Sequence, residues 1–104
     1  MVKSIQLSLY LEEGFKHKRQ PLYEWIIECA KTLHIPGCSC FRSFLGYGKH
    51  QHMHSEGFFE LQGKEIISMM FILSEQQLKG FFDKLKAEKI SCFYTCMEVE
   101  SGVL

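Results

Sequence analysis

The first regular pattern along the chain is a strict alternation of apolar and polar side chains over residues 4–11. Every second position is apolar, and glutamine, serine and tyrosine occupy most of the positions between. The apolar set is Ile5, Leu7, Leu9 and Leu11, and the polar set is Gln6, Ser8 and Tyr10. A period of two is typical of a strand with one buried face. The sequence therefore predicts a first strand over residues 4–11.

Two later stretches carry apolar residues at helical spacing. The first begins at Pro21, which suits a first helical turn because its missing N–H would be unpaired there in any case. The second follows Ser74, which forms a capping-box pattern with Gln77. The apolar stripes are Leu22, Trp25, Ile26, Cys29, Ala30 and Leu33 in the first stretch, and Leu78, Phe81, Phe82 and Leu85 in the second. We expect one helix over residues 21–33 and another after residue 74.

Three further stretches have the apolar content of strands: residues 38–45, 65–73 and 92–99. The run over residues 65–73 is apolar at nearly every position, so it predicts a central strand, and the last five residues of the chain look like a short tail. The order strand, helix, strand, strand, helix, strand predicts an α+β fold. This fold is the ferredoxin-like sandwich, with both helices on one face of an antiparallel sheet.

The other face of this predicted sheet would also be rich in apolar side chains. It would carry Ile66 or Ile67, Met69 or Met70, and part of the strand that begins at Phe93. An exposed apolar face of this size predicts self-association through the sheet.

Composition narrows the class of protein. A chain of 104 residues with 46% hydrophobic content predicts a single domain, residues 1–104. Twelve basic and twelve acidic side chains cancel, which argues against general nucleic-acid binding. The chain starts directly with strand sequence, and no apolar run approaches the roughly 20 residues of a membrane helix. We therefore expect no signal peptide and a cytoplasmic protein.

The cysteines do not predict a disulfide framework. There are five of them, an odd number with no CxxC pair, so we expect reduced and mostly buried thiols. Cys38 and Cys40 share one strand face, and Cys92 and Cys96 share another. The two strands would lie on opposite edges of the sheet, so the four thiols would not converge on one zinc ion, and core packing is favoured.

Residues 41–61 contrast with this regular scaffold. The segment FRSFLGYGKHQHMHSEGFFEL contains turn residues and titratable side chains and has no hydrophobic period. Such a profile is typical of a functional loop on a rigid support, and we expect a long loop over residues 46–61.

Three alternating histidines stand in this segment. His50, His52 and His54 would project to one side of an extended chain, where imidazoles can bind zinc, copper or nickel, with Glu56 as a fourth ligand. The alternative is that they are polar loop residues, and this interpretation is favoured because no fixed carboxylate or thiolate completes the set, so the geometry of the site would depend on a loop.

A basic cluster precedes the first predicted helix. Its members are Lys16, His17, Lys18 and Arg19. Unpaired N–H groups and the helix dipole favour an anion there, so a phosphate or carboxylate could bind with help from Arg42 or Lys49. The alternative is a solvated basic loop offset by Glu12, Glu13 and Glu24.

The sequence offers little support for catalysis. No serine or cysteine is paired by spacing with a histidine and an orienting acid, and no carboxylate pair stands out as an acid and base couple. We predict that the protein is not an enzyme.

These motifs together resemble the PII-like family known as domain of unknown function 190. The residues that carry the resemblance are Leu9-Tyr10-Leu11, HKRQPL at 17–22, Gly37, FRSFLGYG at 41–48, His52-Met53-His54 and Phe58-Phe59. The resemblance implies a homotrimer with its sheets toward the threefold axis and a long loop like the T-loop of PII proteins. In that superfamily the loop base and the clefts between subunits bind adenine nucleotides, and the loop signals to a transporter, enzyme or regulator.

The sequence differs from PII proteins at two places. Gly46-Tyr47-Gly48 matches the Gly-Phe-Gly at the base of the PII loop, but His50 stands where PII proteins have a glutamine. The segment KAEKIS at 86–91 replaces the glycine-rich phosphate-binding segment before the last strand.

The function that we expect is a regulator that binds a small anionic ligand between subunits and signals through residues 46–61. No cofactor is certain, and an adenine nucleotide is the candidate. The expected regulatory target is a membrane transporter or an enzyme. The candidate binding residues are Arg42, Gly46, Tyr47, Gly48, Lys49, His52, His54, Lys18 and Arg19. The first alternative is a trimeric metal-binding or metal-tolerance protein that uses the loop histidines, and a catalytic site between subunits is the second.

Overall fold

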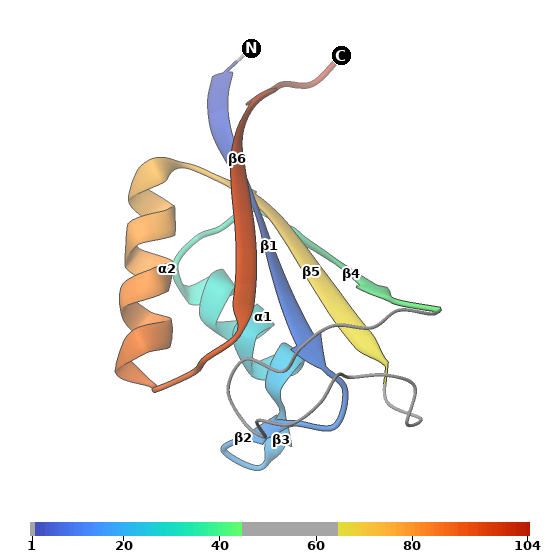
Figure 1. Ribbon diagram of the computed structural model, residues 1–104. Coiled ribbons are helices and arrows are strands. Elements are labelled where there is room, and N and C mark those ends of the chain that lie inside the picture. The colour runs from blue at the N-terminus through green and yellow to red at the C-terminus, as the bar shows by residue number, and fades with distance from the viewer. Residues whose placement is uncertain (1, 45–64) are drawn as a thin grey trace.

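The computed structural model describes residues 2–44 and 65–104, and the fold it shows is the predicted ferredoxin-like sandwich. In chain order the elements are β1 (Val2–Glu12), β2 (Lys16–His17), β3 (Gln20–Pro21), α1 (Leu22–Thr32), β4 (Cys38–Arg42), β5 (Ile66–Leu73), α2 (Glu75–Ala87) and β6 (Phe93–Ser101). Figure 1 shows both ends of the described chain at one end of the sheet and the β2–β3 hairpin at the other.

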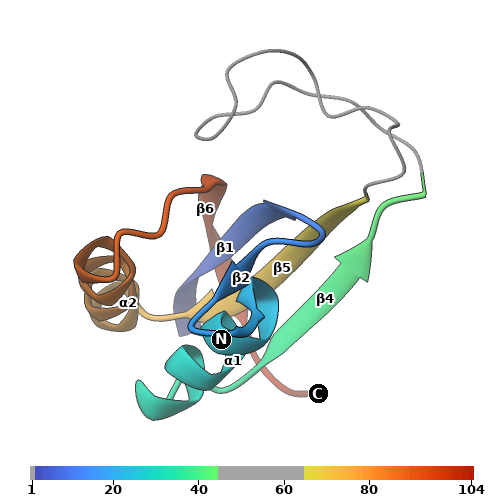
Figure 2. The ribbon, with the colours of Figure 1, turned by 90° about the horizontal axis from the view of Figure 1, so that it is seen from below.

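The main sheet has the strand order β4-β5-β1-β6, and every neighbouring pair is antiparallel. β1 and β5 are therefore central, and β4 and β6 are the edges, as the sequence predicted. Figures 1 and 2 show α1 and α2 packed on the same face of this sheet. This arrangement follows from two crossover connections of the same hand, which place both helices on one side.

The core lies between the helices and the face of the sheet that they cover. The buried side chains of the strands are Leu7, Leu9, Leu11, Ile67, Met69, Phe71 and Leu73, and those of the helices include Ile26, Ala30, Phe81 and Leu85. Phe71 and Phe81 are fully buried, and their rings meet edge to face with centroids 5.1 Å apart. Such pairs add a specific contact to the burial of apolar area.

The side chains that alternate with the core residues along each strand lie on the opposite face of the sheet. Ile66 and Met70 lie on it, whereas Ile67 and Met69 are buried under the helices, which decides the two alternatives that the sequence left open. By register, Phe93 lies beside Tyr10 and Met97 beside Gln6 on the same open face. Phe93 and Met97 are more than half exposed in the single chain, and no helix of the described residues covers them.

Several boundaries differ from the prediction. β6 continues to Ser101 because its last residues pair with the start of β1, so Glu100 and Ser101 are not part of a tail. α1 begins at Leu22, with Pro21 as its N-cap. The small β2–β3 hairpin is not visible in the hydrophobic pattern, since four paired residues are too few to show a period.

The capping box of α2 is confirmed. The backbone N–H of Gln77 donates to Ser74 Oγ at 3.1 Å, and the Gln77 Oε1 accepts from the Ser74 N–H at 2.9 Å. Within the described residues, neither helix has the length and hydrophobicity that a bilayer-spanning helix needs.

Candidate ligand-binding site

The ends of β4 and β5 form the stem from which residues 45–64 depart. The backbone N–H of Ser43 donates to the Ile66 carbonyl at 2.8 Å, and the Ile66 N–H donates to Ser43 Oγ at 3.1 Å. The Glu13 N–H donates to the Glu65 carbonyl at 2.8 Å, so the stem is also tied to the chain that leaves β1. Three segments distant in the sequence thus meet at one end of the sheet.

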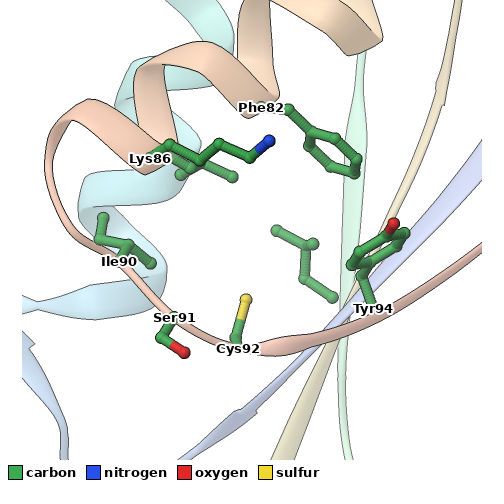
Figure 3. A pocket seen from close by; sticks show the side chains of 8 residues that line it. Phe82, Lys86, Ile90, Ser91, Cys92 and Tyr94 are labelled. Carbon is green, nitrogen blue, oxygen red and sulfur yellow. The ribbon is translucent and has the colours of Figure 1, made fainter. Parts of the chain in front are cut away.

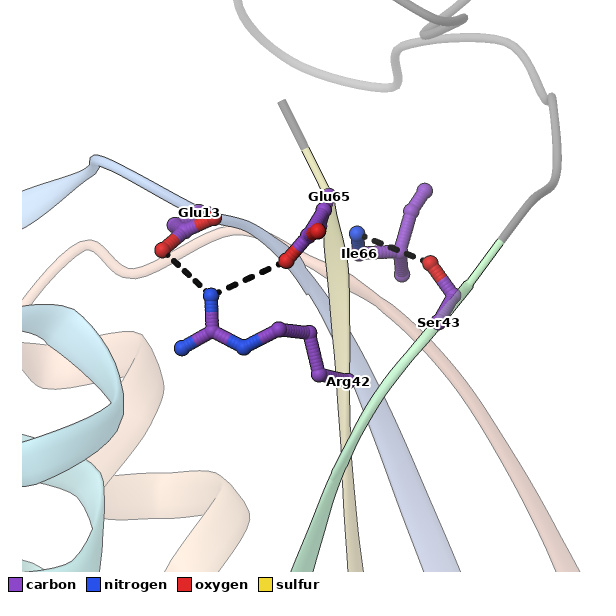
Figure 4. A network of polar contacts seen from close by, with 5 residues as sticks. All are labelled: Glu13, Arg42, Ser43, Glu65 and Ile66. Atoms are coloured by element: carbon purple, nitrogen blue, oxygen red, sulfur yellow. Dashed lines mark hydrogen bonds and ion pairs between the residues drawn. The ribbon is translucent and has the colours of Figure 1, made fainter. Parts of the chain in front are cut away.

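Arg42 joins these segments by its side chain (Figure 4). Its Nη1 donates to Glu13 Oε2 at 2.6 Å and to Glu65 Oε1 at 3.0 Å. We call Glu13, Arg42 and Glu65 the stem clamp. The two carboxylates raise the pKa of Arg42 above its ordinary value, with the Glu13 hydrogen bond as the largest cause. One cation faces two anions here, so an incoming anion must replace a carboxylate to reach Arg42.

The basic cluster folds as the β2–β3 hairpin, and its carboxylate partner is one that the sequence did not indicate. Lys18 and Arg19 are the two turn residues, and both have positive φ, 52° and 70°. This is the backbone of a type I′ hairpin turn, which usually carries asparagine and glycine. Two basic side chains at strained positions suggest a role for them beyond the turn itself.

Glu88 at the end of α2 accepts from this hairpin. His17 Nε2 lies 2.9 Å and Lys18 Nζ 3.3 Å from Glu88 Oε1. The His17 ring also packs edge-on against Trp25, with centroids 4.7 Å apart. The expectation that Glu12, Glu13 and Glu24 offset the cluster is therefore wrong for Lys18: its ion pair is with Glu88, and Glu13 pairs with Arg42.

A cavity of about 240 Å³ opens beside the same end of the molecule, between α2 and the start of β6 (Figure 3). Its lining is mainly apolar, with one cation and two hydroxyl groups at its rim: Leu9, Phe82, Leu85, Lys86, Ile90, Ser91, Cys92 and Tyr94. The Phe82 and Tyr94 rings pack edge-on against each other, with their centroids 4.8 Å apart. Burial raises the pKa of the Cys92 thiol to about 11, so this group is a neutral thiol at pH 7.

The sequence indicates this cavity only in part. Residues 86–91 differ from the glycine-rich segment of PII proteins, but their pattern does not predict a cavity. The chain turns after α2, where Lys89 has a positive φ of 59°. Ile90 and Cys92 follow this turn and line the cavity together with Phe82.

Most of the remaining predicted site residues lie outside the described part of the chain. They are Gly46, Tyr47, Gly48, Lys49, His50, His52, His54 and Glu56. Of the predicted binding residues, the structure places Arg42 in the stem clamp, Lys18 in an ion pair with Glu88, and Arg19 exposed at the hairpin turn. Among residues 2–44 and 65–104, no three potential metal ligands lie together.

The prediction of mostly buried thiols is wrong. All five cysteines are free, but only Cys29 is buried. Cys38 and Cys92 are half-buried, whereas Cys40 and Cys96 are exposed because they stand on the edge strands β4 and β6. An edge strand has no neighbour on one side, so a small apolar side chain there keeps its contact with water.

Two solved proteins have a fold similar to that of this chain. The structure is similar to CPII, a nitrogen regulatory PII-like protein from Thiomonas intermedia bound to ADP, AMP and bicarbonate, with a TM-score of 0.67, 16% identity and 96% of each chain covered. It is also similar to a PII-like signaling protein from Thermus thermophilus, with a TM-score of 0.62 and 17% identity over 94% of this chain and 88% of that one.

Sequence comparison agrees with the structural likeness. A protein of Aquifex aeolicus described as a UPF0166 protein is 26% identical over 88 residues, which are 85% of this chain and 84% of that protein. The sequence profile of the DUF190 family, described as "Uncharacterized ACR", matches residues 4–101.

Proposed function

Because the chain belongs to the DUF190 family and has the fold of PII-like proteins, we propose that it is a regulatory protein that binds a small anionic ligand. The chemical class is suggested by CPII, which was found with ADP, AMP and bicarbonate. An adenine nucleotide is the first candidate for this chain. The proposal includes one domain, residues 1–104, a cytoplasmic homotrimer with ligand clefts between subunits, and no catalytic turnover.

The stem clamp is the observation that carries this proposal. Arg42 is half-exposed and holds the two ends of the stem and the end of β1 through hydrogen bonds to two carboxylates. A ligand phosphate or carboxylate that takes the place of Glu65 would keep Arg42 paired and release one side of the stem. Ligand binding would then change the anchoring of residues 46–61, through which the signal would pass to a transporter or enzyme.

Charges near the stem clamp favour the same end of the molecule for an anion. Arg19 is exposed at the hairpin turn, and Lys86 stands at the rim of the cavity. The cavity supplies an apolar surface of the kind that a purine ring or another flat group can contact. These groups flank one end of the sheet, where a ligand with an apolar part and an anionic part would meet both kinds of surface.

The proposal is tested by calorimetric titration of ADP, AMP and bicarbonate into wild-type protein and two matched variants. Arg42→Met removes the cation and keeps an unbranched side chain, and Lys79→Met removes a cation from exposed α2 surface. We expect Arg42→Met to weaken binding about 10-fold or more, which corresponds to the loss of a charged hydrogen bond, and Lys79→Met to bind like wild type.

A third variant separates recruitment of Arg42 from a general effect of charge. Glu65→Gln replaces the carboxylate that competes with the ligand for Arg42 by a neutral amide, so it should tighten the binding of the same anion. A Glu100→Gln variant, at the far end of the sheet, changes the net charge equally and should not. Equal affinities in the wild type, Arg42→Met and Glu65→Gln would rule out the stem clamp as the site, and an absence of binding to all three anions would contradict the proposed ligand class.

A further inference from the structure

Two cysteines on β4 bring their sulfur atoms close together at the edge of the sheet. Cys38 and Cys40 are two residues apart on an extended strand, so their side chains project to the same face, and their Sγ atoms are 3.9 Å apart. Cys38 packs against the core, whereas Cys40 is exposed. The pair therefore combines a fixed sulfur with an accessible one.

From this geometry we propose that Cys38 and Cys40 form a binding site for one monovalent copper ion. Metal–sulfur bonds of about 2.3 Å place two sulfurs on one ion no more than about 4.6 Å apart. The observed separation of 3.9 Å falls within this limit. A disulfide would need the sulfurs to approach to about 2.05 Å, which two alternate residues of a regular strand do not reach without a backbone shift.

The number of donors favours copper(I) over zinc. Structural zinc takes four ligands, and the described residues bring no three histidine, cysteine or acidic side chains together. Thiolates and thioethers are the soft ligands that select copper(I), which accepts two or three donors. Met69 is paired with Cys40 in the β4–β5 register and faces the same side of the sheet, so its thioether is a candidate for a third donor.

Cys38 and Cys40 are both free cysteines, so metal binding would begin from two thiol groups. The reaction is then one copper(I) ion with two thiols, giving a bis-thiolate complex and two released protons, with no change of oxidation state. Affinity should rise with pH because protons compete with the metal for both sulfurs.

The test is an anaerobic titration of reduced protein with copper(I) in the presence of a chromogenic copper(I) chelator of known affinity. Wild-type protein should withdraw one equivalent of copper, and its affinity should rise between pH 6 and pH 8. Cys40→Ser removes the exposed sulfur and should weaken copper binding by more than roughly 100-fold. Loss of a group that only hydrogen-bonds to a metal ligand already costs up to roughly 100-fold in affinity, and Cys40 would bind the metal directly. Cys96→Ser removes an exposed thiol from the other edge strand and should bind like wild type.

A separate control addresses the three histidines of the segment 46–61. A variant with His50→Ala, His52→Ala and His54→Ala should retain the single tight equivalent, and X-ray absorption of the copper complex should show sulfur ligands. The proposal is overturned if Cys40→Ser keeps wild-type affinity, if the histidine variant loses the ion, or if wild-type protein withdraws no copper from the chelator. None of these outcomes depends on whether the protein binds a nucleotide.

Discussion

At the scale of single residues, a few charged side chains hold one end of the molecule together. Arg42 bridges Glu13 and Glu65, and Glu88 accepts from His17 and Lys18 while Lys84 lies 3.8 Å away. The hydrogen bond from His17 is the largest cause of the lowered pKa of Glu88, and that from Lys18 is next. The Glu88 carboxylate thus connects the end of α2 to the β2–β3 hairpin.

The lowered pKa predicts a pH dependence of stability. A carboxyl group whose pKa is lower in the folded state stabilises the fold above its unfolded pKa, near 4.5, and loses this contribution as pH falls through the folded value. Replacing the Glu88 carboxyl group should therefore lower the free energy of unfolding at neutral pH and change it little in acid. We expect Glu88→Gln to lower the free energy of unfolding at pH 7 and to show a shallower decline below pH 4.5, as measured by urea denaturation over a pH series.

The matched control for this measurement is Asp83→Asn. Asp83 forms an exposed pair with Lys79 on the same helix, 3.4 Å apart. Its removal should change stability little at any pH because exposed i,i+4 pairs contribute only a few tenths of a kcal/mol. Parallel pH profiles for wild type and Glu88→Gln would show that the contacts of Glu88 do not stabilise the fold.

At the scale of elements, the two helices differ in how they begin. α1 starts after Pro21 with no side-chain cap, and its stability depends on the buried face that includes Ile26 and Ala30. α2 has a complete capping box, and Gln77 additionally donates from Nε2 to the carbonyl of His34 at 3.0 Å. The start of α2 is therefore tied to the loop after α1, and the cap has a tertiary as well as a local role.

Removal of the cap should have a measurable effect. Ser74→Ala leaves the Gln77 N–H without its acceptor and should lower the free energy of unfolding by about 1 kcal/mol. Gln76→Ala, an exposed substitution in the same turn, should be near neutral or slightly stabilising because alanine is the better helix former. Chemical denaturation of both variants measures the difference, and equal stability of the two would show that the box is not formed in solution.

At the scale of the whole molecule, the open sheet face exposes apolar side chains in the single chain. It carries apolar side chains from three strands, among them Tyr10, Met70, Phe93 and Met97. Tyr10 and Phe93 already pack against each other, with centroids 5.7 Å apart and their ring planes tilted by 44°. Burial of this face in a homotrimer would remove it from water, in line with the proposed assembly.

A charge on this face should prevent the assembly. Met97 is 58% exposed in the single chain, so Met97→Asp should be tolerated by the fold but disfavoured in an interface, where an unpaired carboxylate would lose its hydration. Light scattering should give three times the chain mass of 12.2 kDa for wild type and a lower mass for the variant. Lys31→Asp, at an exposed position of α1, is the control and should leave the mass unchanged. A monomeric wild type would contradict the trimer, and an unchanged mass in Met97→Asp would show that this face is not the interface.

The amino-acid sequence by itself determined the elements and their order. The period of two in residues 4–11, the helical stripes, the capping box and the apolar central strand are local patterns, and secondary structure follows from them because side-chain direction repeats with the backbone. The order of elements then restricted the topology to the ferredoxin-like sandwich, since crossovers have one hand. It also predicted that β4 and β6 would be the edges, and the structure has them there.

Only the tertiary structure decided which polar and thiol groups meet. His17 and Glu88 are 71 residues apart in the chain and Arg42 and Glu65 are 23 apart, so no local period connects them. Their contacts depend on the register of the sheet and on the direction in which the chain leaves each element. The exposure of Cys40 was decided in the same way, because cysteine is usually buried but an edge strand leaves one side open to water.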